Sequence, residues 1–438
     1  MKVFSLVGIL TVALFSSATL FAQASGRISG TVVDQQGAAI PAATVKVLLQ
    51  GSTSPVAAGQ TNEAGAFIFL GLNPGMFDLS VEQAGFANQV LRGLRIESNR
   101  ELSLPPIAME VSTVSETVEV VASAQSVQTT NAEISNSVTN EQFRALPQLN
   151  RSVTALLQTQ AGVNNSGRVP TTINGLRPAY LNITYEGVNI QDNFIRTNTA
   201  DFQPVRLFTD QVAEMTITTS NSGAVSGGGA AQVNFVAPSG TNEYHGSLYW
   251  SNRNNKFAAN SWFNNRDNVS LPFLNQNQFG GTFGGRIIRN KLFFYANIES
   301  LKVREQASFN RTILTDTARN GTFIYPIAGG TQRANILQLT GKTIDPVAKR
   351  LIDLLPPASA ANNFDVGDSR AGDIRNTIGY RFRTRDNQDR KNIMGKGDWY
   401  INEKNTITGT YSFPELQEVL ALLQQGQGIK YALVPQNA

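Results

Sequence analysis

The 438-residue sequence has no cysteine, a single histidine (His245) and, beyond its first 24 residues, no long apolar run. The absence of cysteine excludes disulfide scaffolds, thiol nucleophiles, iron–sulfur clusters and thiolate zinc sites, and one histidine cannot form a two-histidine metal site. Lys and Arg (36) exceed Asp and Glu (32) by only four and form no basic run, so charge does not indicate nucleic-acid binding. We therefore expect no metal, no cofactor, no nucleic-acid partner and no enzymatic activity.

The first 24 residues have the pattern of a secretory signal peptide. Lys2 precedes an apolar stretch over residues 3–20, and the small-residue triplet Ala22-Gln23-Ala24 predicts cleavage after Ala24. The alternative, an N-terminal membrane anchor, does not need that triplet. No later segment has 18 consecutive apolar residues, so the mature chain could cross a membrane only as strands.

Residues 25–110 predict a β-sandwich. Short runs of alternating apolar residues are separated by turn clusters such as Asn73-Pro74-Gly75, in which glycine supplies positive φ and asparagine bonds its own backbone. The strands are predicted at residues 28–33, 44–49, 67–70, 77–81 and 102–109. The pattern GRISGTVVDQQGAAIPAATVKV, followed by TNEAGAFIFLGLNPGMFDLSVEQAGF, resembles the carboxypeptidase regulatory-like domain, a transthyretin-like sandwich. We interpret its Asp34 and Glu63 as turn residues, because no metal-ligand cluster accompanies them.

The next segment, residues 111–126, alternates polar and β-branched residues without Gly or Pro. It can be extended, but it lacks the bulk to form a core of its own. Two interpretations remain open at this point: a strand that binds a partner's sheet edge by β-augmentation, or a linker to the next domain.

Residues 127–240 predict a small α/β domain. A short helix is expected over residues 148–157, a hairpin around Glu186-Gly187, and two further strands at residues 215–219 and 231–236 that flank the loop 221–229. The triplet Gly227-Gly228-Gly229 is not followed by Lys-Ser/Thr and opens no helix, so we interpret it as a flexible turn and not as a phosphate-binding loop.

From residue 241 onward the sequence predicts part of a transmembrane β-barrel, with a soluble β domain as the alternative. Apolar and aromatic residues alternate with Thr, Asn and Gly, as lipid-facing and lumen-facing residues do. Strands are predicted at residues 245–253, 278–288, 291–303, 393–401 and 406–413, and residues 304–390 are expected to be a long loop with one helix over 346–355. A plugged barrel needs about 22 strands, so five or six predict an incomplete barrel.

The tail 414–438 looks different from the strands before it. Leu416, Val419, Leu420 and Leu423 have the spacing of one helical face, which Gly426 ends. We therefore expect a truncated or frameshifted chain with a partial barrel over residues 241–413 and an atypical tail. The predicted fold class is mainly β: a transthyretin-like sandwich, a small α/β plug, and the first strands of an incomplete transmembrane barrel.

Four further runs resemble the TonB-dependent outer-membrane receptors, in particular those that carry a carboxypeptidase regulatory-like domain. The runs are FRALPQLNRSVTALLQTQAGV, INGLRPAYLNITYEGVNI, VAEMTITTSNSGAVSGGGAAQVNFVAPSGTNEYHGSLYW and NQFGGTFGGRIIRNKLFFYANIESL, which begin at Phe143, Ile173, Val212 and Asn277. The resemblance implies that residues 127–240 are the plug. It also implies a location in the bacterial outer membrane, with the sandwich in the periplasm.

The resemblance assigns roles to particular residues. The TonB-box-like coupling segment within residues 111–126 would comprise Glu116, Thr117, Val118, Glu119 and Val120, and its partner would be a TonB-type protein of the inner membrane. An unidentified extracellular ligand would contact plug loops at residues 195–198 and at Asn221, Gly223, Gly227, Gly228 and Gly229. Outer-membrane lipid would surround the strands. The predicted function is uptake of that ligand, and the alternative is a secreted or periplasmic binding module without a pore.

Overall fold

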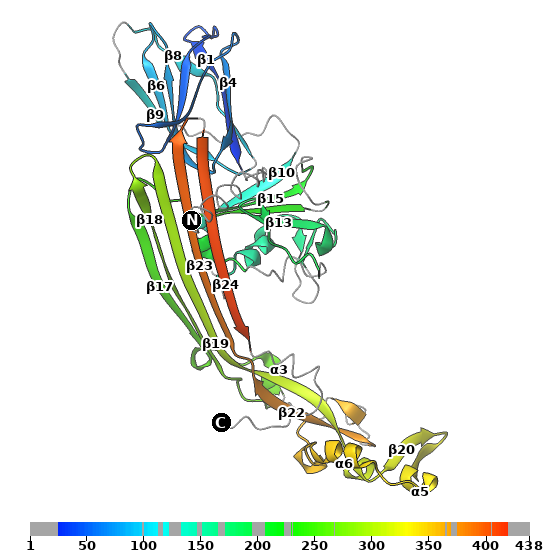
Figure 1. Ribbon diagram of the computed structural model, residues 1–438. Coiled ribbons are helices and arrows are strands. Elements are labelled where there is room, and N and C mark those ends of the chain that lie inside the picture. The colour runs from blue at the N-terminus through cyan, green and yellow to red at the C-terminus, as the bar shows by residue number, and fades with distance from the viewer. Residues whose placement is uncertain are drawn as a thin grey trace, which may run out of the picture. The chain divides into compact units, whose positions relative to one another are not determined.

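The computed structural model (Figure 1) is mainly β, as predicted. It describes residues 25–98, 100–112, 117–121, 133–146, 151–164, 171–194, 206–222, 229, 231–266, 268–363, 366–368, 375–403 and 405–418, with the backbone alone at 117–121 and 416–418. The predicted signal peptide lies outside these residues. The chain forms two compact units: the first comprises residues 1–248, 281–298 and 392–414, and the second comprises residues 249–280, 299–391 and 415–438.

The N-terminal domain is a sandwich of two sheets. One sheet has the order β4 (Ala66–Leu72), β1 (Gly26–Asp34), β7 (Glu101–Ser103), with β8 (Ile107–Met109) also paired to β1; the other has the order β3 (Pro55–Gln60), β2 (Thr44–Leu49), β5 (Gly75–Glu82), β6 (Asn88–Ile96), β9 (Thr117–Val121). The predicted strand 102–109 is divided into β7 and β8, because Pro105 and Pro106 cannot donate to a ladder. Ile28, Val45 and Leu79 are fully buried between the sheets.

Residues 133–240, here called the middle domain, form a five-stranded sheet with short helices. The strand order is β10 (Ile134–Thr139), β15 (Glu214–Ser220), β16 (Ala231–Val236), β13 (Leu181–Tyr185), β14 (Val188–Asn189). The predicted hairpin is confirmed: Glu186 and Gly187 both have positive φ (52° and 79°), as a type I′ turn requires. Smaller elements are β11 (Val163–Asn164), β12 (Thr172–Ile173), η2 (Pro178–Tyr180) and η4 (Thr209–Gln211).

The helices of the middle domain differ from the expectation. In place of the helix predicted over 148–157, the described residues contain a 3-10 helix, η1 (Val153–Thr159). Its Val153, Leu156 and Leu157 are buried. A second helix, α2 (Asn140–Ala145), was not predicted; it begins at a capping box formed by Thr139 and Gln142.

The remaining strands form a long-stranded sheet in the order β17 (His245–Asn254), β18 (Leu274–Ile288), β19 (Leu292–Leu314), β23 (Gln388–Asn402), β24 (Asn405–Glu418), with β22 (Thr377–Arg385) also paired to β19. All five predicted strands are present. Residues 304–390 are not simply a loop: β19 continues to Leu314, and β22 pairs with it. The insertion also contains a hairpin of β20 (Thr322–Ile327) and β21 (Gly330–Asn335), together with α4 (Asp316–Arg319), α5 (Ile336–Thr340), α6 (Pro346–Asp353) and η6 (Ala358–Ala360).

Two shorter elements, η5 (Asn255–Phe257) and α3 (Trp262–Arg266), lie between β17 and β18. The predicted helical face that starts at Leu416 is wrong at its beginning, because β24 continues as a strand through Glu418. Pairing with β23 outweighs the helical spacing, and Pro414 is tolerated because β24 is an edge strand among the described residues. The rest of the predicted helical face lies outside the described residues. No helix in the described part of the chain is both long and apolar enough to cross a bilayer.

Candidate functional site

The middle domain packs on two strands of the long-stranded sheet within the first unit. Its core contains Met215, Val233 and Phe235, and the same buried cluster includes Tyr295 of β19 and Met394 of β23. These two side chains are 6% and 1% exposed. The hydrophobic core of the middle domain is therefore continuous with one face of the sheet, which we call its inner face.

Polar contacts surround this apolar contact. Asp210 of η4 is 2% exposed, and its carboxylate accepts hydrogen bonds from Arg144 at 2.8 Å and Arg151 at 2.7 Å. Its backbone carbonyl accepts a bond from the Tyr295 hydroxyl at 2.8 Å. The neighbouring carbonyl of Gln211 accepts the Tyr185 hydroxyl at 3.0 Å, and burial raises the pKa of Tyr185 above its usual range. The buried carboxylate thus ties η4 to Arg144 and Arg151 within the middle domain, and the backbone carbonyl of Asp210 joins η4 to β19.

Apart from Met394, the inner face of β23 carries polar residues from Asn392 to Asp398. Asn392 donates to the carbonyl of Arg206 at 2.7 Å. Two residues beyond Met394, the Lys396 ammonium lies 3.1 and 3.2 Å from the Glu186 carboxylate oxygens and 3.2 Å from the carbonyl of Ala237. Asp398, 1% exposed, accepts hydrogen bonds from Ser239 and from Thr408 on β24.

The opposite face of the same strands is apolar and exposed. Leu248 on β17 is 91% exposed, and the side chains that share this character in the first unit are Phe283, Ile287, Ile298, Trp399, Ile407, Tyr411 and Phe413. In a soluble protein the apolar face of a sheet is covered and the polar face meets water. Here the polar face is covered by a domain and the apolar face is exposed, which is typical of a barrel wall between lumen and lipid.

Within the described residues, a hydrogen bond between Ser98 and Glu214 joins the sandwich to the middle domain. The backbone N–H of Ser98, between β6 and β7, donates to the Glu214 carboxylate at 3.0 Å, and the hydroxyl of Thr216 donates to it at 2.9 Å. Glu214 is 3% exposed. Burial raises the pKa of Glu214, although these two hydrogen bonds act in the opposite direction.

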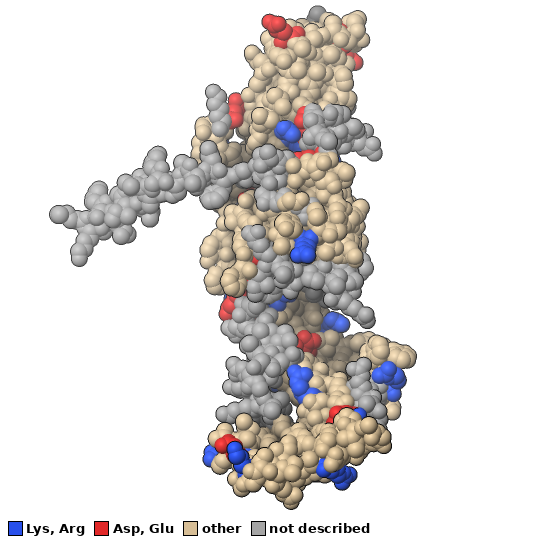
Figure 2. Space-filling model, turned by 90° about the vertical axis from the view of Figure 1, so that its right-hand side faces the viewer, with Lys and Arg blue, Asp and Glu red and all other residues tan. Residues whose placement is uncertain are grey.

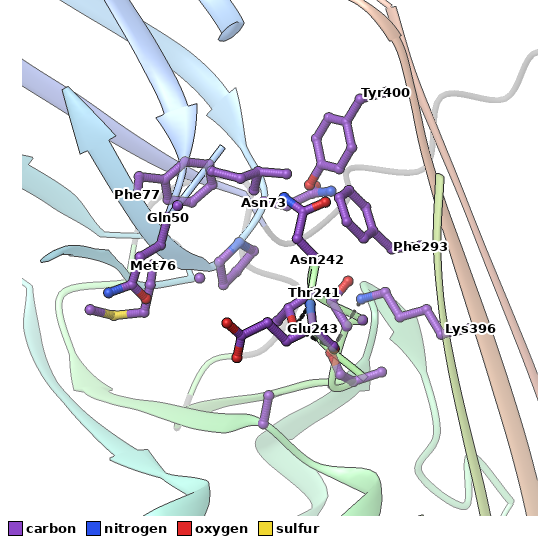
Figure 3. Close-up of a pocket in the computed structure, with 18 residues that line it drawn as sticks. Gln50, Asn73, Met76, Phe77, Thr241, Asn242, Glu243, Phe293, Lys396 and Tyr400 are labelled. Atoms are coloured by element: carbon purple, nitrogen blue, oxygen red, sulfur yellow. Dashed lines mark hydrogen bonds between the residues drawn. The ribbon is translucent and has the colours of Figure 1, made fainter. Parts of the chain in front are cut away.

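A cavity of about 520 Å³ lies in the first unit, where the sandwich loops meet the linker between the middle domain and β17. In Figure 3, Gln50, Met76 and Phe77 line one side, Phe293, Lys396 and Tyr400 line the other, and residues 241–243 lie between them. The volume suits a small ligand or ordered water. Its lining is mixed, with apolar residues such as Met76, Phe77 and Phe293 beside polar ones, and the Lys396 ammonium in it is already paired with Glu186.

The residues predicted for coupling lie apart from this cavity. Glu116 lies outside the described residues, whereas Thr117, Val118, Glu119 and Val120 belong to β9. That strand pairs in parallel with β6, with Val118 opposite Gln89 and Val120 opposite Leu91. The segment is therefore the outermost strand of a sandwich sheet.

The predicted ligand-facing loops are described only in part. Asn221 and Gly229 are both exposed and stand at the end of β15 and before β16, which are antiparallel neighbours, so they lie at one end of the sheet. Gly223, Gly227, Gly228 and the loop 195–198 lie outside the described residues. In the described part of the chain no three His, Asp or Glu side chains gather as metal ligands, and His245 is exposed, with Nδ1 3.1 Å from the carbonyl of Glu243.

Sequence reasoning missed the residues on β23 that hold the middle domain. Asn392, Lys396 and Asp398 were a detectable signal, because these polar residues share one face of a strand whose other face carries Trp399 and Ile401. Their partners, at residues 186–239, could not be read from that spacing.

Comparison with known proteins agrees with this architecture. The family model described as outer membrane beta barrel domain matches residues 236–429, and that of the carboxypeptidase regulatory-like domain matches residues 27–110. The chain is 26% identical over 313 residues to the TonB-dependent transporter Oar of Myxococcus xanthus, an alignment that covers 67% of this chain and 28% of that protein. The chain thus spans less than a third of that relative's length.

Two solved structures are similar to part of the chain. The outer membrane transporter YddB from Escherichia coli has 12% identity and a TM-score of 0.42, and the ferric enterobactin receptor PfeA has 15% identity and a TM-score of 0.36; each match covers 65% of this chain and 33% of the other.

The domain matches define an outer-membrane β-barrel protein, which places the chain in the outer membrane. Its order of domains, with a carboxypeptidase regulatory-like domain before the barrel match, and its similarity to a TonB-dependent transporter support the resemblance to TonB-dependent receptors. The barrel match continues to residue 429 and so includes part of the tail that the sequence analysis separated.

Proposed function

We propose that this protein takes part in TonB-dependent uptake of an extracellular ligand, with the middle domain as the plug. The observation that carries the proposal is the packing of the middle domain on the polar inner face of β19 and β23. A plug must close the lumen at rest and rearrange when it is pulled. Polar contacts suit that task, because water replaces most of their free energy once they open.

The position of β9 supports the coupling role of residues 116–120. As the last strand of its sheet among the described residues, β9 leaves every second backbone N–H and C=O pointing away from β6. A strand from a TonB-type protein can pair with that edge, with main-chain hydrogen bonds supplying the affinity. The coupling partner would then extend a sheet that already includes the sandwich.

The coupling proposal is tested by binding of a purified TonB-type C-terminal domain to the full chain. Val118→Pro removes a backbone donor and bends the strand, and we expect at least about tenfold weaker binding. Val118→Thr keeps the N–H and the β-branched shape, so its binding should match that of the parent chain. Equal binding by the proline variant would remove the coupling role from this segment.

The alternative, a secreted or periplasmic binding module without a pore, is supported by the cavity beside the sandwich. The exposed apolar face of the strands weighs against it, because a soluble domain rarely leaves so many large apolar side chains open to water. Partition into detergent separates the two: a receptor wall requires detergent to remain dispersed, whereas a soluble module does not.

A further inference from the structure

The cavity beside the sandwich has an apolar interior. Phe77 of β5 and Phe293 of β19 both line it, and each is 2% exposed. Met76, which also lines the cavity, is 36% exposed and therefore lies nearer to solvent. Lys396 lines the cavity as well, but its charge is balanced by the Glu186 carboxylate. The interior therefore suits the apolar part of a small ligand.

The walls of the cavity are held together by apolar and polar contacts. Tyr400 of β23 lines the cavity and packs against the hydrophobic core of the sandwich. Asn73, in the turn before β5, donates to the Thr408 hydroxyl of β24 at 3.4 Å. Asn290, in the turn between β18 and β19, donates to the Thr53 hydroxyl at 3.3 Å. The site is thus largely preformed, and little binding free energy would be lost in ordering its walls.

The backbone of Glu243, in the linker before β17, is fixed by its neighbours. The Thr241 hydroxyl accepts the Glu243 N–H at 3.3 Å and donates to the Glu243 carbonyl at 3.0 Å. The Asn242 side chain accepts the Asn290 N–H at 2.9 Å and donates to the Asn290 side-chain oxygen at 2.8 Å. The Asn242 carbonyl accepts a bond from Arg286 at 2.8 Å. These contacts set the point from which the Glu243 side chain extends.

The Glu243 carboxylate gives the cavity an unbalanced negative charge. Of the residues that line the cavity, only Lys396 and Glu243 are charged, and Lys396 is paired with Glu186. Within the described residues the Glu243 carboxylate has no hydrogen-bond or ion-pair partner, and neither has the side-chain amide of Gln50. Figure 3 shows this carboxylate on the side of the cavity that Gln50 and Met76 line, away from the Lys396 ammonium. The cavity therefore favours a cation at that side.

We propose that this cavity binds a small organic amine with an aromatic or aliphatic body. The protonated amine donates to the Glu243 carboxylate and to the amide oxygen of Gln50, and the body rests against Phe77 and Phe293. A volume of about 520 Å³ admits a small molecule and is too small for a folded partner. An anionic ligand of the same shape would meet the unpaired carboxylate and be rejected.

The cavity is separate from the loops predicted to meet the extracellular ligand. Ala213, which lines the cavity, and Asn221, in a predicted loop, stand at opposite ends of β15. The seven residues of that strand span about 23 Å at about 3.3 Å per residue. On the face that Figure 2 shows, the described acidic side chains stand singly or beside a basic one. A small cation therefore meets no described acidic cluster on that face that would compete with the cavity.

The experiment measures binding of three probes of similar shape to the full chain in neutral detergent, by ligand-observed NMR. The probes are tyramine, the neutral alcohol tyrosol and the anion para-hydroxyphenylacetate. We expect tyramine to bind at least about fivefold more tightly than tyrosol, and the anion to bind least. Glu243→Gln should lower the affinity for tyramine to that for tyrosol. The matched control, Glu63→Gln, removes the same charge from an exposed turn of the sandwich and should bind like the parent. Gln50→Trp places a large ring at the cavity and should weaken binding of every probe.

A preference for tyramine that is lost in Glu243→Gln and kept in Glu63→Gln, together with weaker binding of every probe by Gln50→Trp, supports the proposal. Absence of tyramine binding, equal binding of tyramine and tyrosol by the parent, or an equal loss in Glu63→Gln overturns it. Unchanged binding by Gln50→Trp also overturns it, because the amine would then bind outside the cavity. The readout does not involve uptake, so the amine site and the proposed transport can fail independently.

Discussion

Replacing Lys396 with methionine is expected to loosen the middle domain from the inner face of β23. Methionine keeps most of the length of the side chain but removes the ammonium that lies 3.1 Å from the Glu186 carboxylate. Coulomb's law at an effective dielectric constant of about 20 gives about 5 kcal/mol for that separation. Removing one partner of a buried pair costs about 3 to 5 kcal/mol, and both side chains here are nearly buried, at 5% and 12% exposure.

The absence of cysteine provides the assay. Met394→Cys places a single thiol under the middle domain, where the native side chain is 1% exposed, so that thiol labelling requires the domain to move away. A loss of about 3 kcal/mol should accelerate labelling by about 100-fold or more. Lys391→Met, on the exposed face of the same strand, is the matched control and should change the rate little.

A double-mutant cycle separates the ion pair from other effects. Glu186→Gln keeps an acceptor for the Ala237 N–H but removes the charge, and Glu186→Gln/Lys396→Met removes both charges together. We expect each single variant to accelerate labelling strongly. The acceleration in the double variant should be well below the product of the two single accelerations. Additive effects, or single variants within a few-fold of the parent, would refute the reasoning that this pair holds the domain.

Two further predictions concern the linkages around the middle domain. Because burial raises the pKa of Glu214, the stability linked to its protonation is fully present below its ordinary pKa and is lost as the pH rises through its folded pKa; thermal unfolding from about pH 4 to about pH 8 should show this decline, and Glu214→Gln should reduce it. Gly240→Ala would place a methyl group against the carbonyl oxygens of Phe294 and Gly285 and should cost about 1 to 3 kcal/mol in denaturant unfolding, whereas Gly395→Ala, with open space around it, should cost less. A melting temperature that does not fall with rising pH would contradict the account of Glu214. Equal losses of unfolding free energy in the two glycine variants would contradict the account of Gly240.

The elements that the sequence predicted well have a regular local pattern. The hairpin at Glu186-Gly187 follows from turn chemistry, and β17 and β18 follow from alternation. The missed sandwich strands lack that regularity: β3 contains Ala57, Ala58 and Gly59, which favour strands weakly, and Gly93 gives β6 a positive φ.

Other features depend on distant pairing, which a local pattern cannot specify. The end of β19 and all of β22 are rich in charged and polar residues and were expected to be loop. The two strands instead form a ladder of nine residue pairs, in which each supplies hydrogen-bond partners for the backbone of the other. The site shows the same limit. Lys396 could be recognised as an inward polar residue, yet its partner Glu186 stands 210 residues earlier in the chain. Residues 111–126 were expected to be either a strand for a partner's sheet edge or a linker, and only the structure shows residues 117–121 paired with β6 of the same chain.

The parallel pairing of β9 with β6 also has a mechanical consequence. A pull along the axis of β9 loads all five residue pairs in shear, so they must fail together, whereas a pull across the strand opens them one at a time. The resistance of the segment therefore depends on the direction of the force. A partner that pulls along β9 would move the whole sandwich as one load, and one that pulls across β9 would strip the strand away and leave the sandwich in place.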